Sequence, residues 1–132
     1  MTLYVDTSAL LALIHRDDAH HRAVVETVTR LVAEGHRFVT TSYALVETGA
    51  LVKRRLGRDA FRSLGEAVRR GMDVVWVDEA LHDLAWAEAA QAGERGPSLV
   101  DCAGFQVMRS LGIDTALALD AHFRRAGFAV RP

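Results

Sequence analysis

The sequence predicts an α/β fold in which a mainly parallel sheet is covered by helices on both faces. Short apolar runs with β-like composition alternate along the chain with longer stretches of helical periodicity. The breaks between them are short, as expected for strand and helix units joined by tight turns. The chain has 132 residues and contains no linker or internal repeat, so residues 1–132 are expected to form a single domain.

The first third of the chain predicts two strands separated by two helices. Thr2–Val5 is a short apolar run that is typical of a buried strand. An apolar helix is expected over about Ser8–Ile14, and an amphipathic helix over Ala19–Ala33. Gly35 closes the second helix, because glycine readily adopts the left-handed conformation that ends helices. Arg37–Thr41 is the second predicted strand.

The middle third predicts two helices, a strand and a further helix. Ser42 is expected to cap a helix that runs through Arg55, before the break at Gly57, and another helix follows over about Asp59–Arg70. Met72–Val77 is the strongest strand candidate in the chain because it is rich in valine. A helix then covers Glu79–Ala92. Its apolar positions, expected to face the core, are Leu81, Leu84, Ala85 and Trp86.

The last third begins with a loop over Gly93–Pro97. Ser98 then starts a helix that ends at Gly112, and Asp101 stands three residues after Ser98, a pairing typical of a capping box. The remaining predicted elements are a strand over Thr115–Leu119, a short helix over Ala121–Ala126 and a strand over Phe128–Val130.

Composition excludes several classes of protein. One cysteine, Cys102, excludes a disulfide framework and a zinc site built from thiolates. No apolar run approaches the roughly 20 residues that span a bilayer, and no basic region precedes the first apolar stretch, so we expect no membrane association and a cytoplasmic location. The net charge of −1 does not by itself indicate a nucleic-acid ligand.

Four isolated acids stand in stretches that otherwise lack charge. Each is the only charged residue in its segment, the segments being residues 1–14, 38–52, 96–108 and 115–123. Burying such a carboxylate is costly unless it is paired or binds a cation. Any one of them could be an ordinary helix cap or turn acid, and this interpretation applies best to Asp101. The four acids are Asp6, Glu47, Asp101 and Asp120.

The predicted topology brings the four acids toward one edge of the sheet. Asp6 and Asp120 directly follow strands, and Glu47 lies in the second turn of a helix that leaves a strand. The helix that bears Asp101 leads to the strand at Thr115, which begins at the opposite edge. Asp101 is therefore also expected near the carboxyl ends of the strands. Open parallel sheets bind ligands at this edge. Asp114 precedes its strand and is expected at the opposite edge.

A cluster of carboxylates without a nearby lysine suits a hard divalent cation, Mg²⁺ or Mn²⁺, rather than zinc. Such ions polarise a phosphoryl oxygen and generate a hydroxide nucleophile from bound water. The predicted chemistry is hydrolysis of a phosphodiester or a phosphate. An aspartyl-phosphate phosphatase is an alternative, because Asp6 opens a DTS tripeptide after a strand. That class needs a lysine at a later strand end, and the chain's only lysine, Lys53, lies late in a helix.

Other candidate sites have simpler interpretations. Cys102, next to Asp101, is expected to be a buried apolar residue rather than a nucleophile. His15, His20 and His21 are expected at the surface. Tyr43 and Trp86 are expected to pack in the core, since neither stands among the alternating basic and aromatic residues that are typical of a nucleic-acid-binding surface.

Four ordered motifs resemble those of the PIN-domain nucleases, most closely toxins of the VapC type. The motifs are YVDTSALLAL, TTSYALVETGAL, PSLVDCAGF and LDAHF, and the match in order, spacing and length covers essentially the whole chain. The resemblance implies a three-layer α/β/α sandwich and Mg²⁺- or Mn²⁺-dependent cleavage of single-stranded RNA. In the last motif Ala118 stands where the family often has a hydroxyl residue.

The resemblance also assigns roles to residues. Asp6, Glu47, Asp101 and Asp120 match the catalytic, metal-binding acids, and Ser8 matches a hydroxyl residue that orients a carboxylate or phosphate. Arg124 is a candidate RNA-phosphate contact because it closely follows Asp120. The implied partners are an antitoxin protein and a second copy of the chain in a homodimer. A non-catalytic interaction module that uses the acidic pocket for a structural ion or a partner's arginine remains the alternative function.

Overall fold

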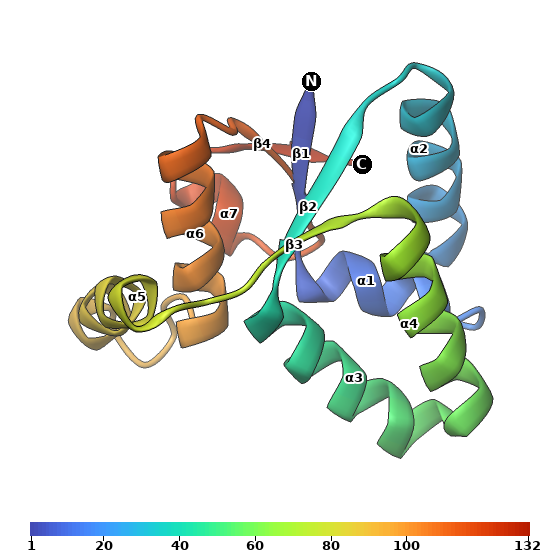
Figure 1. Cartoon of the computed structure of the whole chain (residues 1–132), viewed down its shortest axis with the longest axis horizontal. Coiled ribbons are helices and arrows are strands. Elements are labelled where there is room, and N and C mark those ends of the chain that lie inside the picture. The colour runs from blue at the N-terminus through green and yellow to red at the C-terminus, as the bar shows by residue number, and fades with distance from the viewer.

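A computed structural model describes all 132 residues and contains five strands and seven helices (Figure 1). The strands are β1 (Thr2–Val5), β2 (Arg37–Thr41), β3 (Asp73–Val75), β4 (Thr115–Leu117) and β5 (Ala129–Arg131). The helices are α1 (Thr7–Ile14), α2 (His21–Ala33), α3 (Ser42–Leu56), α4 (Arg58–Gly71), α5 (Glu79–Gln91), α6 (Leu99–Leu111) and α7 (His122–Arg125).

The five strands form one parallel sheet in the order β3-β2-β1-β4-β5. The chain builds outward from β1 through β2 to β3, and then returns to add β4 and β5 on the other side of β1. The direction of winding therefore switches between β1 and β4. In parallel α/β sheets a crevice forms at such a switch, outside the carboxyl ends of the two strands.

Helices cover both faces of the sheet, so the molecule is the expected three-layer sandwich (Figure 1). Successive side chains of a strand point to opposite faces. Leu3 and Val5 of β1 accordingly join a core cluster formed with residues of α1–α4, whereas Tyr4 joins a second cluster formed mainly with residues of α6. The core thus consists of one cluster on each side of the sheet.

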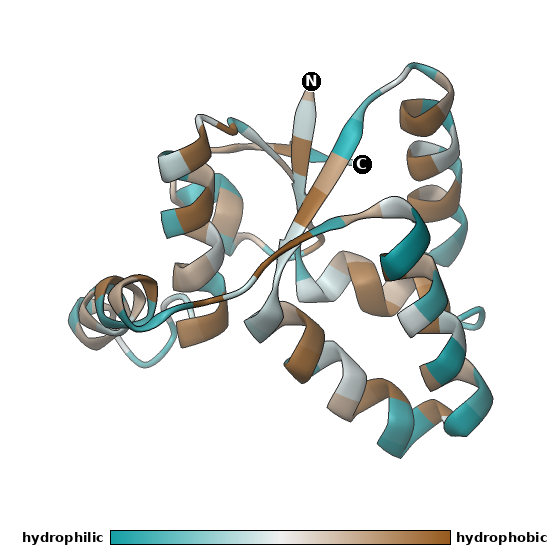
Figure 2. Cartoon of the chain, viewed as in Figure 1, coloured by the Kyte–Doolittle hydropathy of each residue, from teal (hydrophilic) through white to brown (hydrophobic).

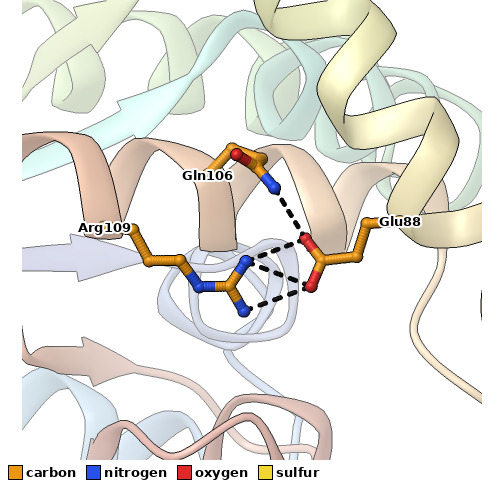
Figure 3. Close-up of polar contacts among 3 residues, drawn as sticks. All are labelled: Glu88, Gln106 and Arg109. Atoms are coloured by element: carbon orange, nitrogen blue, oxygen red, sulfur yellow. Dashed lines mark hydrogen bonds and ion pairs between the residues drawn. The ribbon is translucent and has the colours of Figure 1, made fainter.

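Helices α5 and α6 pack against each other, and a polar cluster joins them (Figure 3). The Arg109 guanidinium of α6 donates to both carboxylate oxygens of Glu88 in α5 at 3.0–3.1 Å, and the Gln106 amide donates to the same carboxylate at 3.0 Å. Arg109 also lies 5.8 Å from the ring centre of Phe105. Because α6 packs on the sheet, these hydrogen bonds from Arg109 and Gln106 to Glu88 attach the more peripheral α5 to the core.

Most predicted elements are present, with two corrections at α3 and α5. Thr41, not Ser42, caps α3, since its Oγ1 accepts from the Ala44 backbone N–H at 3.1 Å. Ser42 Oγ instead accepts from the Val77 N–H at 2.9 Å and connects α3 to the chain that follows β3. In α5 only Ala85 is fully buried. Leu84 is 57% exposed and Trp86 is 59% exposed, so the expected core positions of these two residues are wrong.

Hydropathy follows the layers. Figure 2 shows hydrophobic residues along the central strands and hydrophilic residues where α3 and α4 meet at their outer ends. None of the seven helices combines the length and apolar composition needed to cross a bilayer.

Candidate metal centre

Three of the four predicted acids converge at the switch point of the sheet. Asp6 follows β1, Asp120 lies beyond the end of β4, and Asp101 stands in the first turn of α6. Carboxylate oxygens of these three residues all lie within 4.8 Å of one another. Asp6, more than 90 positions away from the other two acids in the sequence, thus joins them in one group of oxygen donors.

Local hydrogen bonds fix the Asp6 carboxylate. Asp6 is the N-cap of α1, and its Oδ2 accepts from the Ser8 N–H at 3.2 Å and from the Ser8 hydroxyl at 2.6 Å. The Ser8 Oγ in turn accepts from the Leu119 backbone N–H at 3.0 Å. Ser8 therefore connects the acid after β1 to the segment after β4, the two elements that border the switch point.

The other two acids are also held by helix starts. Asp101 completes a capping box with Ser98: its Oδ2 accepts from the Ser98 N–H at 2.9 Å, and its own N–H donates to Ser98 Oγ at 3.1 Å. Asp120 Oδ1 accepts from the His122 N–H at 3.0 Å, just before α7. Free N–H groups and the positive end of the helix dipole stabilise carboxylates at such positions.

Burial and the charges of neighbouring acids disfavour ionisation of Asp6 and Asp101. Asp6 is 1% exposed and Asp101 is 8% exposed. Desolvation, with added repulsion from Asp120 and Asp101, raises the pKa of Asp6 to about 7, against the lowering effect of Ser8. Desolvation and Asp120 also raise the pKa of Asp101. None of the four ion pairs in the molecule involves these acids, so no arginine or lysine neutralises them.

This donor set fits a hard divalent cation. Three carboxylates offer only oxygen ligands, which suits Mg²⁺ or Mn²⁺ and not the sulfur- and nitrogen-rich sites of zinc. A bound divalent cation would also neutralise the buried carboxylates, which form no ion pair with an arginine or a lysine. Cys102 adds no ligand, because it is fully buried and desolvation raises its pKa to about 11, so it is the apolar residue that the sequence predicts.

Glu47 and Arg124 lie outside the three-carboxylate group. Glu47 is exposed in the second turn of α3, and its carboxylate is not among the oxygens within 4.8 Å. The helix rises about 1.5 Å per residue, which carries Glu47 away from the cap at the sheet edge. Arg124 is exposed in α7 and forms none of the ion pairs.

Sequence reasoning missed two groups that border the site. The Leu119 N–H fixes Ser8, but a backbone donor gives no signal in a sequence. The imidazole of His122 lies close enough to Asp101 to contribute to lowering the pKa of that carboxyl. Its position two residues after Asp120 could have indicated this role.

Comparison with known proteins identifies the family. The family model of the PIN domain matches residues 3–129, nearly the whole chain. The chain belongs to the PIN-domain family. The 23S rRNA-specific endonuclease VapC20 from two strains of Mycobacterium tuberculosis is 40% identical to it over 135 residues, which covers 98% of each chain. The predicted enzyme class, a PIN-domain nuclease, is thereby confirmed.

Three solved structures share the fold. The crystal structure of M. tuberculosis VapC20, a sarcin–ricin loop cleaving toxin, matches with a TM-score of 0.85 and 36% identity, over 98% of this chain and 99% of that chain. VapBC2 from Rickettsia felis, bound to a DNA fragment from its promoter, gives a TM-score of 0.72 at 12% identity over 99% and 98% of the two chains. FitAcB from Neisseria gonorrhoeae gives a TM-score of 0.65 at 17% identity, and the match covers 100% of this chain and 97% of that chain. The last two similarities show the fold alone.

Proposed function

We propose that this protein is a Mg²⁺- or Mn²⁺-dependent endoribonuclease and the toxin of a toxin–antitoxin pair. The observation that carries the proposal is the convergence of Asp6, Asp101 and Asp120 at the switch point, without a neutralising cation, in a PIN domain 40% identical to a ribosomal RNA endonuclease. Cleavage of ribosomal RNA implies that the protein acts in the cytoplasm.

In this proposal the three aspartates hold the divalent ion. When bound, the ion polarises the scissile phosphate and lowers the pKa of a water molecule, which supplies the nucleophile. Ser8 keeps the Asp6 carboxylate oriented, and Ser98 does the same for Asp101. Glu47 is proposed as a more peripheral acid that reaches the site by a change of rotamer, and exposed Arg124 as a contact for an RNA phosphate.

The proposed substrate is a single-stranded region of RNA, and specifically the sarcin–ricin loop of 23S rRNA that the relative VapC20 cleaves. The decisive experiment incubates the purified chain with a synthetic sarcin–ricin hairpin and with intact 23S rRNA, in Mn²⁺, Mg²⁺ or EDTA, and maps the cut by primer extension. We expect a single cut with either metal and none in EDTA. Full cleavage in EDTA would contradict the proposal.

Asp6→Asn and Asp101→Asn should each reduce cleavage by more than about 100-fold. Each change removes a charged ligand at nearly constant volume, and even groups that only orient a metal ligand contribute up to about 100-fold. Asp114→Asn is the matched control, since Asp114 precedes β4 at the opposite edge of the sheet. Glu47→Gln should lower activity less than the two site variants do. Wild-type activity in Asp6→Asn would exclude Asp6 from the metal site.

The proposed protein partner is an antitoxin that inserts a basic side chain, most suitably arginine, between the three carboxylates. An acidic crevice without an internal cation matches the fork of a guanidinium. Co-expression with the product of the adjacent gene should yield a co-purifying complex without RNase activity. Two proteins that elute separately, with cleavage intact, would contradict this partner. A homodimer is also proposed, and sedimentation equilibrium of the isolated chain tests it.

A further inference from the structure

An aromatic row crosses the start of α3 and the exposed side of α5. The row consists of Tyr43, His82 and Trp86. The Tyr43 hydroxyl hydrogen-bonds His82 Nδ1, and the His82 ring centre lies 5.9 Å from that of Tyr43 and 5.5 Å from that of Trp86. The indole of Trp86 is therefore flanked by a ring whose orientation is fixed, although Trp86 itself is 59% exposed. An exposed tryptophan held in this way is preorganised to contact a ligand.

Trp86 borders an apolar hollow of about 260 Å³, and the other lining residues are Ala89, Ala90 and Leu99. This volume lies just below the roughly 300–1,000 Å³ of sites for drug-sized molecules, so the hollow suits a single planar ring system. The lining offers apolar surface and a π face but no charged group. Such a surface favours stacking over hydrogen-bonded recognition.

The aromatic row and the hollow include residues at the starts of α3 and α6, and the acidic site uses the start of α6 as well. Leu99 is the first residue of α6, two positions before Asp101. Tyr43 lies in the first turn of α3, close to the cap Thr41, whose hydroxyl is 3.4 Å from the Tyr4 hydroxyl. Tyr4, in β1, stands two positions before Asp6, and its ring packs against α6 at Gly104, three positions after Asp101. The aromatic row therefore begins at a helix start that is linked through Thr41 and Tyr4 to β1, which Asp6 directly follows, and to α6, which carries Asp101.

We propose that the aromatic row and the hollow form a base-stacking subsite for the RNA substrate. This inference rests on the proposed function and adds a residue that contacts the substrate. A nucleotide next to the scissile phosphate places its base on Trp86, while its backbone lies at the three aspartates that would hold the ion. Stacking on an aromatic ring tolerates any base, because every base has a π face. The subsite therefore contributes affinity for unstacked RNA rather than sequence discrimination.

Steady-state cleavage of the sarcin–ricin hairpin in Mn²⁺ tests the proposal. Trp86→Ala should raise KM about tenfold, within the range measured for loss of one stacked base, and change kcat by less than about twofold. Trp86→Phe keeps a π face and should restore most of the affinity. Trp76 provides the matched control: it is 75% exposed just after β3 and does not line the hollow, so Trp76→Ala should leave KM unchanged. Equal KM values in wild type and Trp86→Ala would overturn the proposal.

Fluorescence gives a second readout, because the chain has two tryptophans. In an Asp101→Asn, Trp76→Phe chain, emission comes from Trp86 alone, and the hairpin should quench it at saturation. In an Asp101→Asn, Trp86→Phe chain the Trp76 emission should stay constant. Loss of a dimer in Trp86→Ala at unchanged KM would instead assign Trp86 to a protein interface and overturn the RNA subsite. A wild-type chain that cleaves no RNA would contradict the proposed function itself.

Discussion

At the scale of the residue, Ser8 links two parts of the acidic site. Its hydroxyl donates to Asp6 and accepts from the Leu119 N–H, so both of its hydrogen-bonding functions are used. The bond to Asp6 favours the ionised carboxylate and opposes part of the desolvation that raises the pKa of Asp6. Ser8 thus keeps a buried acid both oriented and closer to ionisation.

Removing this hydroxyl should weaken metal binding without unfolding the protein. We expect Ser8→Ala to lower cleavage at limiting Mn²⁺ by about 10–100-fold, the usual effect of losing a group that orients a metal ligand. The pKa of Asp6 should rise further, so the acid limb of the pH–rate profile should move to higher pH. Ser8→Thr, which keeps a hydroxyl, should retain more activity than Ser8→Ala. An unchanged acid limb in Ser8→Ala would show that Ser8 does not act through Asp6.

At the scale of the element, the close approach of α6 to β1 positions Asp101. A Cβ at Gly104 would lie 2.8 Å from ring atoms of Tyr4, so only glycine allows the helix to pack this closely on the strand. Tyr4 is fully buried, stacks with Phe123 at 5.5 Å and has little room to move. The short separation between α6 and the sheet therefore depends on the absence of a side chain at Gly104.

Gly104→Ala should destabilise the fold although alanine is the better helix former. Overpacking of a buried contact costs about 1–3 kcal/mol, which exceeds the gain of up to about 1 kcal/mol in helix propensity. Chemical denaturation should show a lower free energy of unfolding, and cleavage should fall because Asp101 shifts with α6. Gly65→Ala in α4 is the control: a Cβ at this position would meet no atom within 4 Å, so the change should stabilise the protein by about 0.5–1 kcal/mol. Equal effects of the two changes would contradict this account.

At the scale of the whole molecule, a bound ion would connect β1, α6 and the segment after β4. Without the ion, the buried acids repel one another and the fold must tolerate that repulsion. Because the pKa of Asp6 is near 7 in the folded chain and near 3.8 when exposed, the folded state binds more protons between these values. The stability of the metal-free protein should therefore fall as the pH rises from about 4 to about 7.

Melting curves in EDTA and in Mn²⁺ test this coupling between the site and the fold. In EDTA at pH 8, Asp6→Asn should melt above the wild type, by about 4 °C for each kcal/mol of relieved repulsion, and the difference should vanish at pH 4. Mn²⁺ at a hundredfold excess over its dissociation constant should stabilise the wild type by about 2.7 kcal/mol. Asp6→Asn should lose most of that gain, whereas Asp114→Asn should keep it. A wild-type response to Mn²⁺ in Asp6→Asn would show that no cation site includes Asp6.

The sequence by itself determined the order of the strands and helices, the capping box at Ser98 and Asp101, and the family to which the chain belongs. Periodicity, turns and caps depend on residues within a few positions of one another, and the order and spacing of the motifs can be read along the chain without knowledge of tertiary contacts. Asp6 and Asp120 could be assigned to one edge because residues that directly follow parallel strands share that edge.

Only the tertiary structure decided which acids meet and which aromatic side chains reach the surface. Glu47 and Asp101 both belong to helices that begin near the carboxyl edge, yet only Asp101 joins the group within 4.8 Å, because the tilt and axial position of each helix depend on its packing. Trp86 lies on a helix whose apolar residues suggest a core face, but α5 packs chiefly on α6 and leaves Trp86 exposed. Helical periodicity predicts that a helix has an apolar face, whereas the partner that covers this face depends on contacts between residues distant in the sequence.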